Sequence, residues 1–432
     1  MATQYTTTLM TDIVKEIIRE DILPGFQRSH REFSLLKQIN DSSGMNSRGY
    51  QIPVYIEPET SRVWGAEGYT HPEGSTDADI KMTALIARYS KAFEFSGDML
   101  AFDKPGSKSL LRIKERFKRL KTNIFVEFSQ LFYGDGSGVL AVLAATPVST
   151  TLTLSDTVAE AVGYTFATFG AELLEKNLVV DIYNNDRTIL RGTYTISSIA
   201  SGTTVVVSGD PAGDGVVDND VIVAADSSGY AFKGLHEHAV LTSGTYQNKD
   251  RATYPQLKPR SNDMSGQPLS WGLMNFMEET ATFRLDPEDV DSVNGACKIM
   301  TSMCQLSKVR QMGANQVEYQ GGETTLTLGF NKVKTALGGM WEAFDWCPEH
   351  VVYFIHQPSL LLVNAQELDY TNYGSNGDMV WATTTSGGGR RDAAYGSISW
   401  KGQLIGLDPR KQGAMHNLSM DGPRRADYSS RA

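Results

Sequence analysis

A basic amphipathic helix, set between a strand and a glycine-rich stop, is the feature that most limits how this chain can fold. Residues 85–95 alternate apolar and polar side chains, as in a half-buried strand. Residues 103–106, Asp-Lys-Pro-Gly, are typical of a turn. Beyond the turn, apolar residues recur at spacings of three and four, which predicts a helix of about six turns with one apolar stripe. The stripe consists of Leu110, Ile113, Phe117, Leu120, Ile124, Phe128 and Leu131. The sequence GDGSG at 134–138 then ends the helix.

The first half of this helix is strongly basic. Residues 104–121 carry eight basic residues and one acidic residue, a net charge of +7. Such a face is most often the solvated back of a domain. The neighbouring segments favour a more specific interpretation.

Three segments, in this order along the chain, resemble the major capsid proteins of tailed bacteriophages, whose shared fold is named after the phage Hong Kong 97. They read AFEFSGDML at 92–100 with the long helix after it, LFYGDGSGVLA at 131–141, and IGLDPR at 405–410. The resemblance covers residues 45–145 and 330–420 and, less closely, 233–265. It does not extend over 147–232.

The resemblance implies an α+β capsid fold of the Hong Kong 97 type, with an N-terminal arm, an extended hairpin loop, a long spine helix, and peripheral and axial domains. The stretch 147–232 is rich in Val, Thr, Ser and Gly, which predicts an additional, inserted small β domain. The expected division is 1–44 for the arm, 45–102 for the hairpin loop, 103–146 for the spine helix with part of the peripheral domain, 147–232 for the inserted domain, and 233–432 for the remainder of the peripheral and axial domains.

The extended hairpin is also indicated by the residues themselves. Tyr50, Ile52 and Val54 alternate as in a strand, and we expect this strand to pair with the one that ends at Phe95. The tip between them, Glu57 to Ile80, is rich in Glu, Gly, Pro and Asp. A loop of that length is rare unless it has a function or is held by a partner. In the capsid family, the corresponding loop reaches over a neighbouring subunit.

Further elements follow from local patterns. The inserted domain should contain four short strands, at 178–183, 193–199, 205–208 and 221–224. Periodic apolar residues predict helices at 269–283 and 293–311. The continuous apolar run 351–355 predicts a buried central strand. Residues 395–400 and 404–407 are expected to form a closing pair of strands.

Composition narrows the class of protein. The chain is 41% apolar and 21% charged, as is ordinary for a soluble globular protein. It has no run of eighteen apolar residues and no signal-peptide pattern, so we expect neither export nor a membrane span. Its three cysteines form no CxxC pair and indicate thiols in a reducing compartment. The net charge of −10 argues against tight, sequence-independent binding of nucleic acid by the whole protein.

Candidate sites for chemistry are few. His236-Glu237-His238 lacks the spacing of a zinc motif. Asp210, Asp214, Asp218 and Asp220 could ligate calcium, but an acidic loop in solvent is the favoured interpretation because the spacing is not that of an EF-hand. The segment GGGRR at 387–391 lacks the Lys-Ser or Lys-Thr of a phosphate loop and is expected to be a linker. We therefore predict no catalytic residue, no cofactor and no resident metal.

The function that the resemblance implies is that of a major capsid protein. Many copies would associate as hexamers and pentamers into an icosahedral shell in the host cytoplasm, around packaged double-stranded DNA. Expected partners are a portal, a separate scaffolding protein, because no scaffolding segment precedes the arm, and decoration proteins. One alternative is an encapsulin-type nanocompartment that holds protein cargo. Another, from a different class, is a hydrolase or sugar-binding protein that uses the β domain as a binding module.

The charge pattern predicts one contact between subunits. The hairpin tip carries six acidic residues and one base, a net charge of −5, while the start of the helix carries +7. We expect the tip of one subunit to dock along the helix of its neighbour, with two aromatic residues as apolar anchors. The predicted contact residues are Glu57, Glu59, Arg62, Trp64, Glu67, Tyr69, Glu73 and Asp77 on the tip and Lys108, Arg112, Arg116 and Arg119 on the helix. The alternative is that both charged faces are solvated independently.

Overall fold

The structure is a computed structural model of the 432-residue chain. It describes residues 32, 36–39, 45–46, 49–57, 78–96, 108–155, 170–171, 173–282, 297–314, 332–334, 340–344, 346–371, 380–383 and 390–419. Most of the predicted N-terminal arm, the hairpin tip from 58 to 77, and Gly387 to Gly389 therefore lie outside the described residues.

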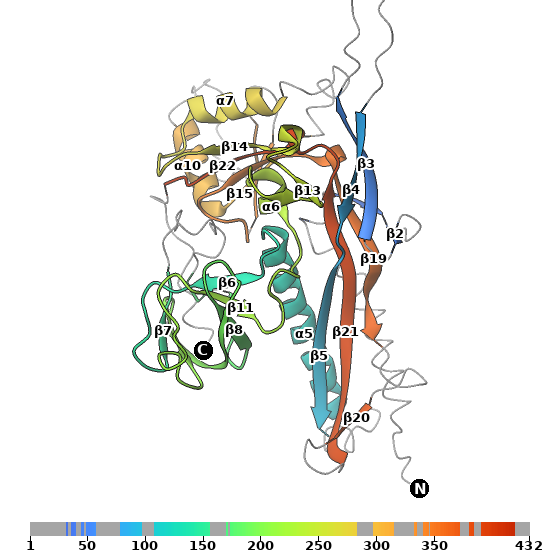
Figure 1. Cartoon of the computed structure of the whole chain (residues 1–432), viewed down its shortest axis with the longest axis vertical. Helices are drawn as coiled ribbons and strands as arrows, with labels where there is room; N and C mark the ends of the chain where they lie inside the picture. Colours follow the sequence, from blue (N-terminus) through green and yellow to red (C-terminus); the bar gives the residue numbers. More distant parts are fainter. Residues whose placement is uncertain are drawn as a thin grey trace, which may run out of the picture.

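A long sheet forms one side of the molecule (Figure 1). Its strands are β1 (Lys37–Ile39), β19 (Leu360–Thr371), β21 (Arg390–Gly406), β20 (Val380–Thr383) and β5 (Ala87–Ser96). β21 is the longest, with 17 residues, and it pairs with β5 along one edge and with β19 and β20 along the other. Residues 395–400 and 404–407 thus belong to one strand, and the predicted closing pair of strands is wrong.

Helix α5 (Lys108–Phe132) covers one face of the long sheet and confirms the predicted amphipathic helix. Phe128 packs edge-on against Tyr89 of β5 and Trp400 of β21, with ring centroids 4.8 and 5.0 Å apart. Glu127 accepts hydrogen bonds from the Tyr89 hydroxyl and the Lys91 ammonium. Apolar packing and this polar pair together fix the helix on the sheet.

A three-stranded sheet forms the base of the extended hairpin. It consists of β2 (Met45–Asn46), β3 (Gly49–Glu57) and β4 (Ala78–Ala84), and β3 confirms the predicted strand at Tyr50 to Val54. The expected partner of β3 is wrong, because β3 pairs with β4, and the strand that ends near Phe95 pairs with β21 instead. Leu85 and Ile86 separate β4 from β5, so the chain passes there from one sheet to another.

An upper six-stranded sheet lies beside the long sheet (Figure 1). In spatial order, its strands are β14 (Arg260–Asp263), β22 (Gly413–His416), β18 (Val352–His356), β15 (Cys297–Thr301), β17 (Met340–Ala343) and β16 (Lys332–Lys334). Helices α7 (Trp271–Thr282) and α10 (Met303–Ala314) pack on one face, and α6 (Leu235–Ala239) with the end of α5 packs on the other. Every residue of β18 is buried, which confirms the predicted central strand.

The predicted helix at 269–283 is confirmed by α7, but the one at 293–311 is only half correct. Its first part is β15, which pairs with β17 and β18 on its two edges. Helix α10 begins after Ser302, whose hydroxyl accepts a hydrogen bond from the Gln305 amide as an N-cap does. A short apolar run cannot by itself distinguish a buried strand from a helix, and here pairing on two sides decides for the strand.

The third body is a small β-barrel. Its strands, in spatial order, are β6 (Val139–Val142), β11 (Val221–Ala224), β8 (Val179–Tyr183), β9 (Leu190–Ser201), β10 (Thr204–Val207) and β7 (Thr151–Thr153). A bridge between Leu143 and Leu154 joins the two end strands, so the sheet closes on itself. Four of these strands confirm the strands predicted between 178 and 224. The barrel also includes β6, which precedes residue 147.

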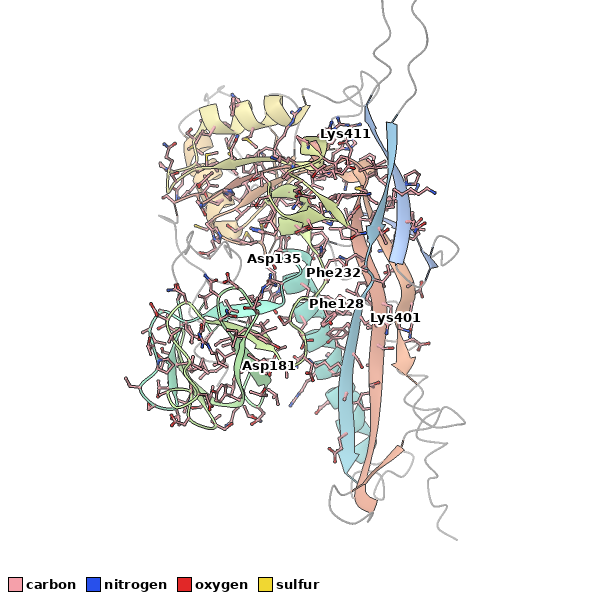
Figure 2. All side chains as sticks on the ribbon, in the orientation of Figure 1. Phe128, Asp135, Asp181, Phe232, Lys401 and Lys411 are labelled. Atoms are coloured by element: carbon pink, nitrogen blue, oxygen red, sulfur yellow. The ribbon has the colours of Figure 1, made fainter. Side chains whose placement is uncertain are left out.

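The barrel has its own apolar core and its two chain ends meet. Val180, Ile196 and Val205 are among the buried side chains that pack together inside it. At the junction with the upper end of α5, Asp135 forms a strand bridge with Lys233, and the Gly234 amide donates to the Gly134 carbonyl over 2.9 Å. Figure 2 shows Asp135 and Phe232 at this junction, with Asp181 on strand β8 of the barrel.

Removal of the barrel should leave the rest of the chain folded, because its core is separate and its ends are adjacent. We expect a variant with a short Gly-Ser linker in place of 139–231 to keep a cooperative thermal transition. The control is Phe128→Ala, which should lower the free energy of unfolding by about 3–5 kcal/mol by opening a cavity between the helix and the long sheet. Circular dichroism during heating measures both. Complete unfolding of the deletion variant would mean that the barrel is part of the main core.

Candidate intersubunit surface

The base of the extended hairpin is amphipathic and lies with its apolar face on the body. On β3, Ile52 faces this way, and on β4 its cross-strand partner Met82 and the nearby Ala84 do the same. Ile52 and Ala84 pack on Val363 and Ile405 of the long sheet. The opposite face of the hairpin is solvated, so burial of one face sets the side on which it docks.

The remainder of the apolar face rests on a small connector between the barrel and the upper sheet. After α6 come β12 (Thr245–Tyr246), β13 (Lys249–Asp250) and a 3₁₀ turn, η3 (Pro255–Leu257). Met82 packs with Tyr246 and Leu257, all three at most 1% exposed. The Thr83 amide donates to the Gln247 carbonyl over 3.0 Å. The connector therefore holds the hairpin base through the apolar cluster around Met82 and the backbone hydrogen bond from Thr83.

Arg251 is the hub of this connector. Its side chain is 1% exposed, and its guanidinium donates to the carbonyls of Glu237 (2.6 Å), Ser243 (3.0 Å) and Leu257 (3.4 Å). It also lies over the Tyr246 ring, 4.6 Å from the centroid. A buried guanidinium that binds three carbonyls fixes the loop around it, because each carbonyl would be unpaired without it.

Tyr246 links the connector to the end of the long sheet. Its hydroxyl lies 2.7 Å from Nδ1 of His238 and donates to the Gly406 carbonyl over 3.4 Å. A Cβ at Gly406 would come within 2.1 Å of the Tyr246 hydroxyl, so only glycine allows this approach. Hairpin, connector and long sheet thus meet at one buried point.

The titratable groups of α6, next to the connector, have shifted pKa values. Burial raises the pKa of Glu237 from 4.5 to about 7, although Arg251, whose Nη2 lies 3.5 Å from Oε1 of Glu237, and Lys233 act against the shift and Asp135 adds to it. Burial lowers the pKa of His238 to about 3 and that of His236 to about 4. Both imidazoles are therefore neutral at pH 7.

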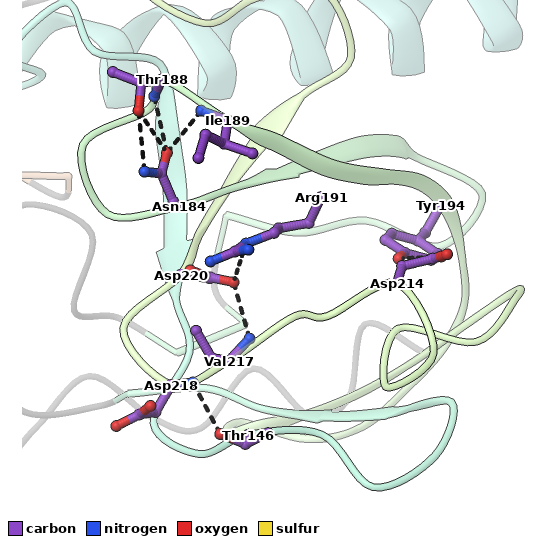
Figure 3. Close-up of polar contacts among 10 residues, drawn as sticks. All are labelled: Thr146, Asn184, Thr188, Ile189, Arg191, Tyr194, Asp214, Val217, Asp218 and Asp220. Atoms are coloured by element: carbon purple, nitrogen blue, oxygen red, sulfur yellow. Dashed lines mark hydrogen bonds and ion pairs between the residues drawn. The ribbon is translucent and has the colours of Figure 1, made fainter.

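No group of three or more His, Cys, Asp or Glu side chains in the described part of the chain is arranged to hold a metal ion. His236 and His238 are buried in α6. In the barrel, the acidic residues turn to separate partners: Asp214 accepts from the Tyr194 hydroxyl, and Asp220 pairs with Arg191 (Figure 3). Among the helices that the structure describes, none has the length and apolarity to cross a bilayer.

The predicted contact residues fall into three groups. Those of the tip, from Glu59 to Asp77, lie outside the described residues, and Glu57 is the last residue of β3. Lys108, Arg112 and Arg116 lie on α5, and the Arg119 side chain, also on α5, is exposed.

β3 and β4 lie in the upper half of the molecule, whereas α5 begins at the lower end (Figure 1).

Sequence reasoning missed the connector. Met82, Tyr246 and Arg251 carry no local motif, and the turn at Gln247-Asn248 lacks the glycine that usually marks a two-residue hairpin turn. The one available signal was a lone arginine in a segment of mixed structure, which is ordinarily a surface residue.

Neither a protein-family model nor a curated protein matches the chain. Solved structures to which it is similar are phage and GTA capsids. The "Cyanophage A-1(L) capsid asymmetric unit" is 13% identical over 90% of this chain and 92% of that chain, with a TM-score of 0.49. The "Capsid of native GTA particle" is 8% identical over 89% of each chain, with a TM-score of 0.43. The procapsid of satellite phage P4, which includes the size determination (Sid) protein, is 8% identical over 97% and 98%, with a TM-score of 0.41. At these values the function has to be inferred from this chain's own elements.

The buried carboxyl of Glu237 should make stability depend on pH. Because the pKa of Glu237 is raised in the folded protein, the folded state binds more protons than the unfolded state between about pH 4.5 and 7. The protonated carboxyl therefore contributes to the free energy of unfolding at low pH, and this stabilisation is lost as pH rises through that window. The lowered pKa values of the buried histidines act in the opposite direction, so a variant must isolate the effect. We expect the stability of Glu237→Gln relative to the parent to rise by about 2–3 kcal/mol from pH 5 to pH 8. Urea unfolding at each pH measures it, and a constant difference would refute the assignment.

Proposed function

We propose that this chain is the major capsid protein of a tailed phage, which associates as hexamers and pentamers into a closed icosahedral shell around double-stranded DNA. The observation that carries the proposal is the presence of two oppositely charged elements in one chain. The hairpin base, whose apolar face is buried on the body, leads into an acidic segment, and the first half of α5 is basic. Oppositely charged elements of this kind can attract each other across a contact between two copies.

The contact we propose joins the acidic tip of one subunit to the basic helix of its neighbour. The tip residues are those between Glu57 and Asp77, and the helix residues are Lys108, Arg112, Arg116 and Arg119. Each segment repels itself, so docking relieves two unfavourable charge balances at once. A single exposed ion pair contributes only about 0–1 kcal/mol, but several pairs repeated around a ring add up.

The same proposal assigns a role in the shell to each part of the subunit. The hairpin joins neighbours, α5 with the long sheet forms the peripheral part, the upper sheet with α7 and α10 forms the axial part, and the barrel is an inserted module. A portal, a separate scaffolding protein and decoration proteins are proposed partners. An encapsulin-type shell would use the same contacts around protein cargo, and its particle contents would distinguish it.

Purified protein should form closed shells with hexagonal and pentagonal clusters, visible by negative-stain electron microscopy. Because the proposal includes a separate scaffolding protein, the protein is to be tested alone and co-expressed with the scaffolding protein from its own genome. Light scattering follows the mass in solution. A protein that remains monomeric at high concentration under both conditions would refute the proposal and favour the hydrolase or sugar-binding alternative.

Charge reversal on the helix should block assembly without unfolding the subunit. We expect the triple variant Arg112→Glu, Arg116→Glu and Arg119→Glu to remain a folded monomer, because Arg119 is exposed and repulsion from the acidic tip replaces attraction. Glu67→Lys and Glu73→Lys, added to the triple variant, should partly restore the shells. The contact should also weaken near 1 M salt, where the Debye length is about 3 Å. Normal assembly of the triple variant would exclude the contact.

A further inference from the structure

Gln247 occupies an unfavourable position in the connector. It lies in the turn between β12 and β13, with φ at +44°, and Asn248 follows with φ at +67°. These values belong to a type I′ turn, which favours Gly, Asn and Asp. The Gln247 side chain is 5% exposed, yet within the described part of the chain neither amide atom has a hydrogen-bond partner. A buried amide without partners destabilises the conformation that holds it.

This position contrasts with another buried glutamine of the same fold. Gln412 is fully buried, its Nε2 donates to the His356 carbonyl and the Ser359 hydroxyl, and its Oε1 accepts from the His356 amide, at 3.1, 2.6 and 3.0 Å. The fold is therefore able to satisfy a buried amide. Gln247 differs from Gln412 in that both of its amide atoms lack a partner among the described residues.

That place is next to a hinge. The carbonyl of Gln247 accepts the Thr83 amide of β4, and the adjacent Tyr246 packs on Met82. Immediately after β4, Leu85 and Ile86 belong to no strand, and Leu85 is 70% exposed. A change of backbone angle at these two residues would tilt the hairpin relative to the long sheet. Both strand ladders would stay intact, and the packing of Ile52 and Ala84 on the long sheet would have to shift.

We propose that the β12–β13 turn is a latch held in a strained state, which holds the hairpin in the free subunit and relaxes when the hairpin tilts during assembly. On relaxation, the Gln247 amide pairs with peptide groups on the edge of β4 that β3 leaves open. A side-chain amide presents one donor and one acceptor side by side, which matches a peptide group. This inference rests on the proposed shell, because tilting is coupled to contact between copies.

The test compares Gln247→Met with the matched control Gln412→Met, in the free subunit and in shells. Methionine keeps the length of the side chain and removes both polar amide atoms. In the free subunit, Gln247→Met should raise the melting temperature by about 1–3 °C, because it removes a buried amide that has no hydrogen-bond partner. Gln412→Met should lower the melting temperature by more than that, because it removes hydrogen bonds that the folded subunit makes.

In shells, Gln247→Met should lower the urea concentration at which the particles dissociate, although its subunit is more stable. Shells of Gln247→Met that resist urea as well as, or better than, the parent shells would overturn the latch. A free subunit destabilised by Gln247→Met would overturn it as well. Failure of the parent protein to form shells would refute the proposed function instead, so the two failures are distinguishable.

Discussion

The pairing of β21 along both of its edges is the constraint on which the rest of the fold depends. Its ten residues from Ala393 to Gly402 pair with β5, and its other edge pairs with β19 and β20. Trp400 on this strand receives Phe128 of α5, and Ile405 receives the hairpin base. Helix, hairpin and connector are therefore positioned by one strand, and a slip of one residue in its register would turn every one of these contacts to the wrong face.

Two glycines make this convergence possible. A Cβ at Gly402 would lie 2.3 Å from the Trp400 ring, and one at Gly406 would lie 2.1 Å from the Tyr246 hydroxyl. Both sit in an extended strand, where glycine ordinarily weakens pairing. In this sheet they provide the space that an indole and a phenol need, so a local loss of strand propensity is exchanged for close packing of large aromatic side chains.

Gly402 illustrates which parts of the fold could be predicted from the sequence and which could not. Helix α5, strand β3 and the barrel strands are local patterns, and they were predicted from periodicity and composition. The glycine at 402, between Lys401 and Gln403, resembles a turn, so the sequence predicted two strands where β21 is one. The partner of β3 depends on contacts made far along the chain, which no local pattern encodes. For the candidate surface, charge balance predicted the basic helix, whereas the Arg251 hub depends on three carbonyls brought together only by the fold.

The barrel differs from the rest of the molecule in two respects: its sheet is closed, and it is strongly acidic. Closure through the Leu143–Leu154 bridge leaves no long open edge, so the barrel is protected against pairing with strands of other copies. Residues 139–232 carry eleven acidic and three basic residues, so most of the chain's net charge of −10 resides there. Neighbouring barrels would repel one another, and phosphates would repel them as well. A closed acidic module of this kind resists both strand pairing and binding to nucleic acid, which in the proposed function would leave association between copies to the hairpin and the helix. In the proposed shell, one chain would combine two surfaces that bind neighbouring copies with an insertion that does not, and each contact could be weak because the shell would repeat it many times.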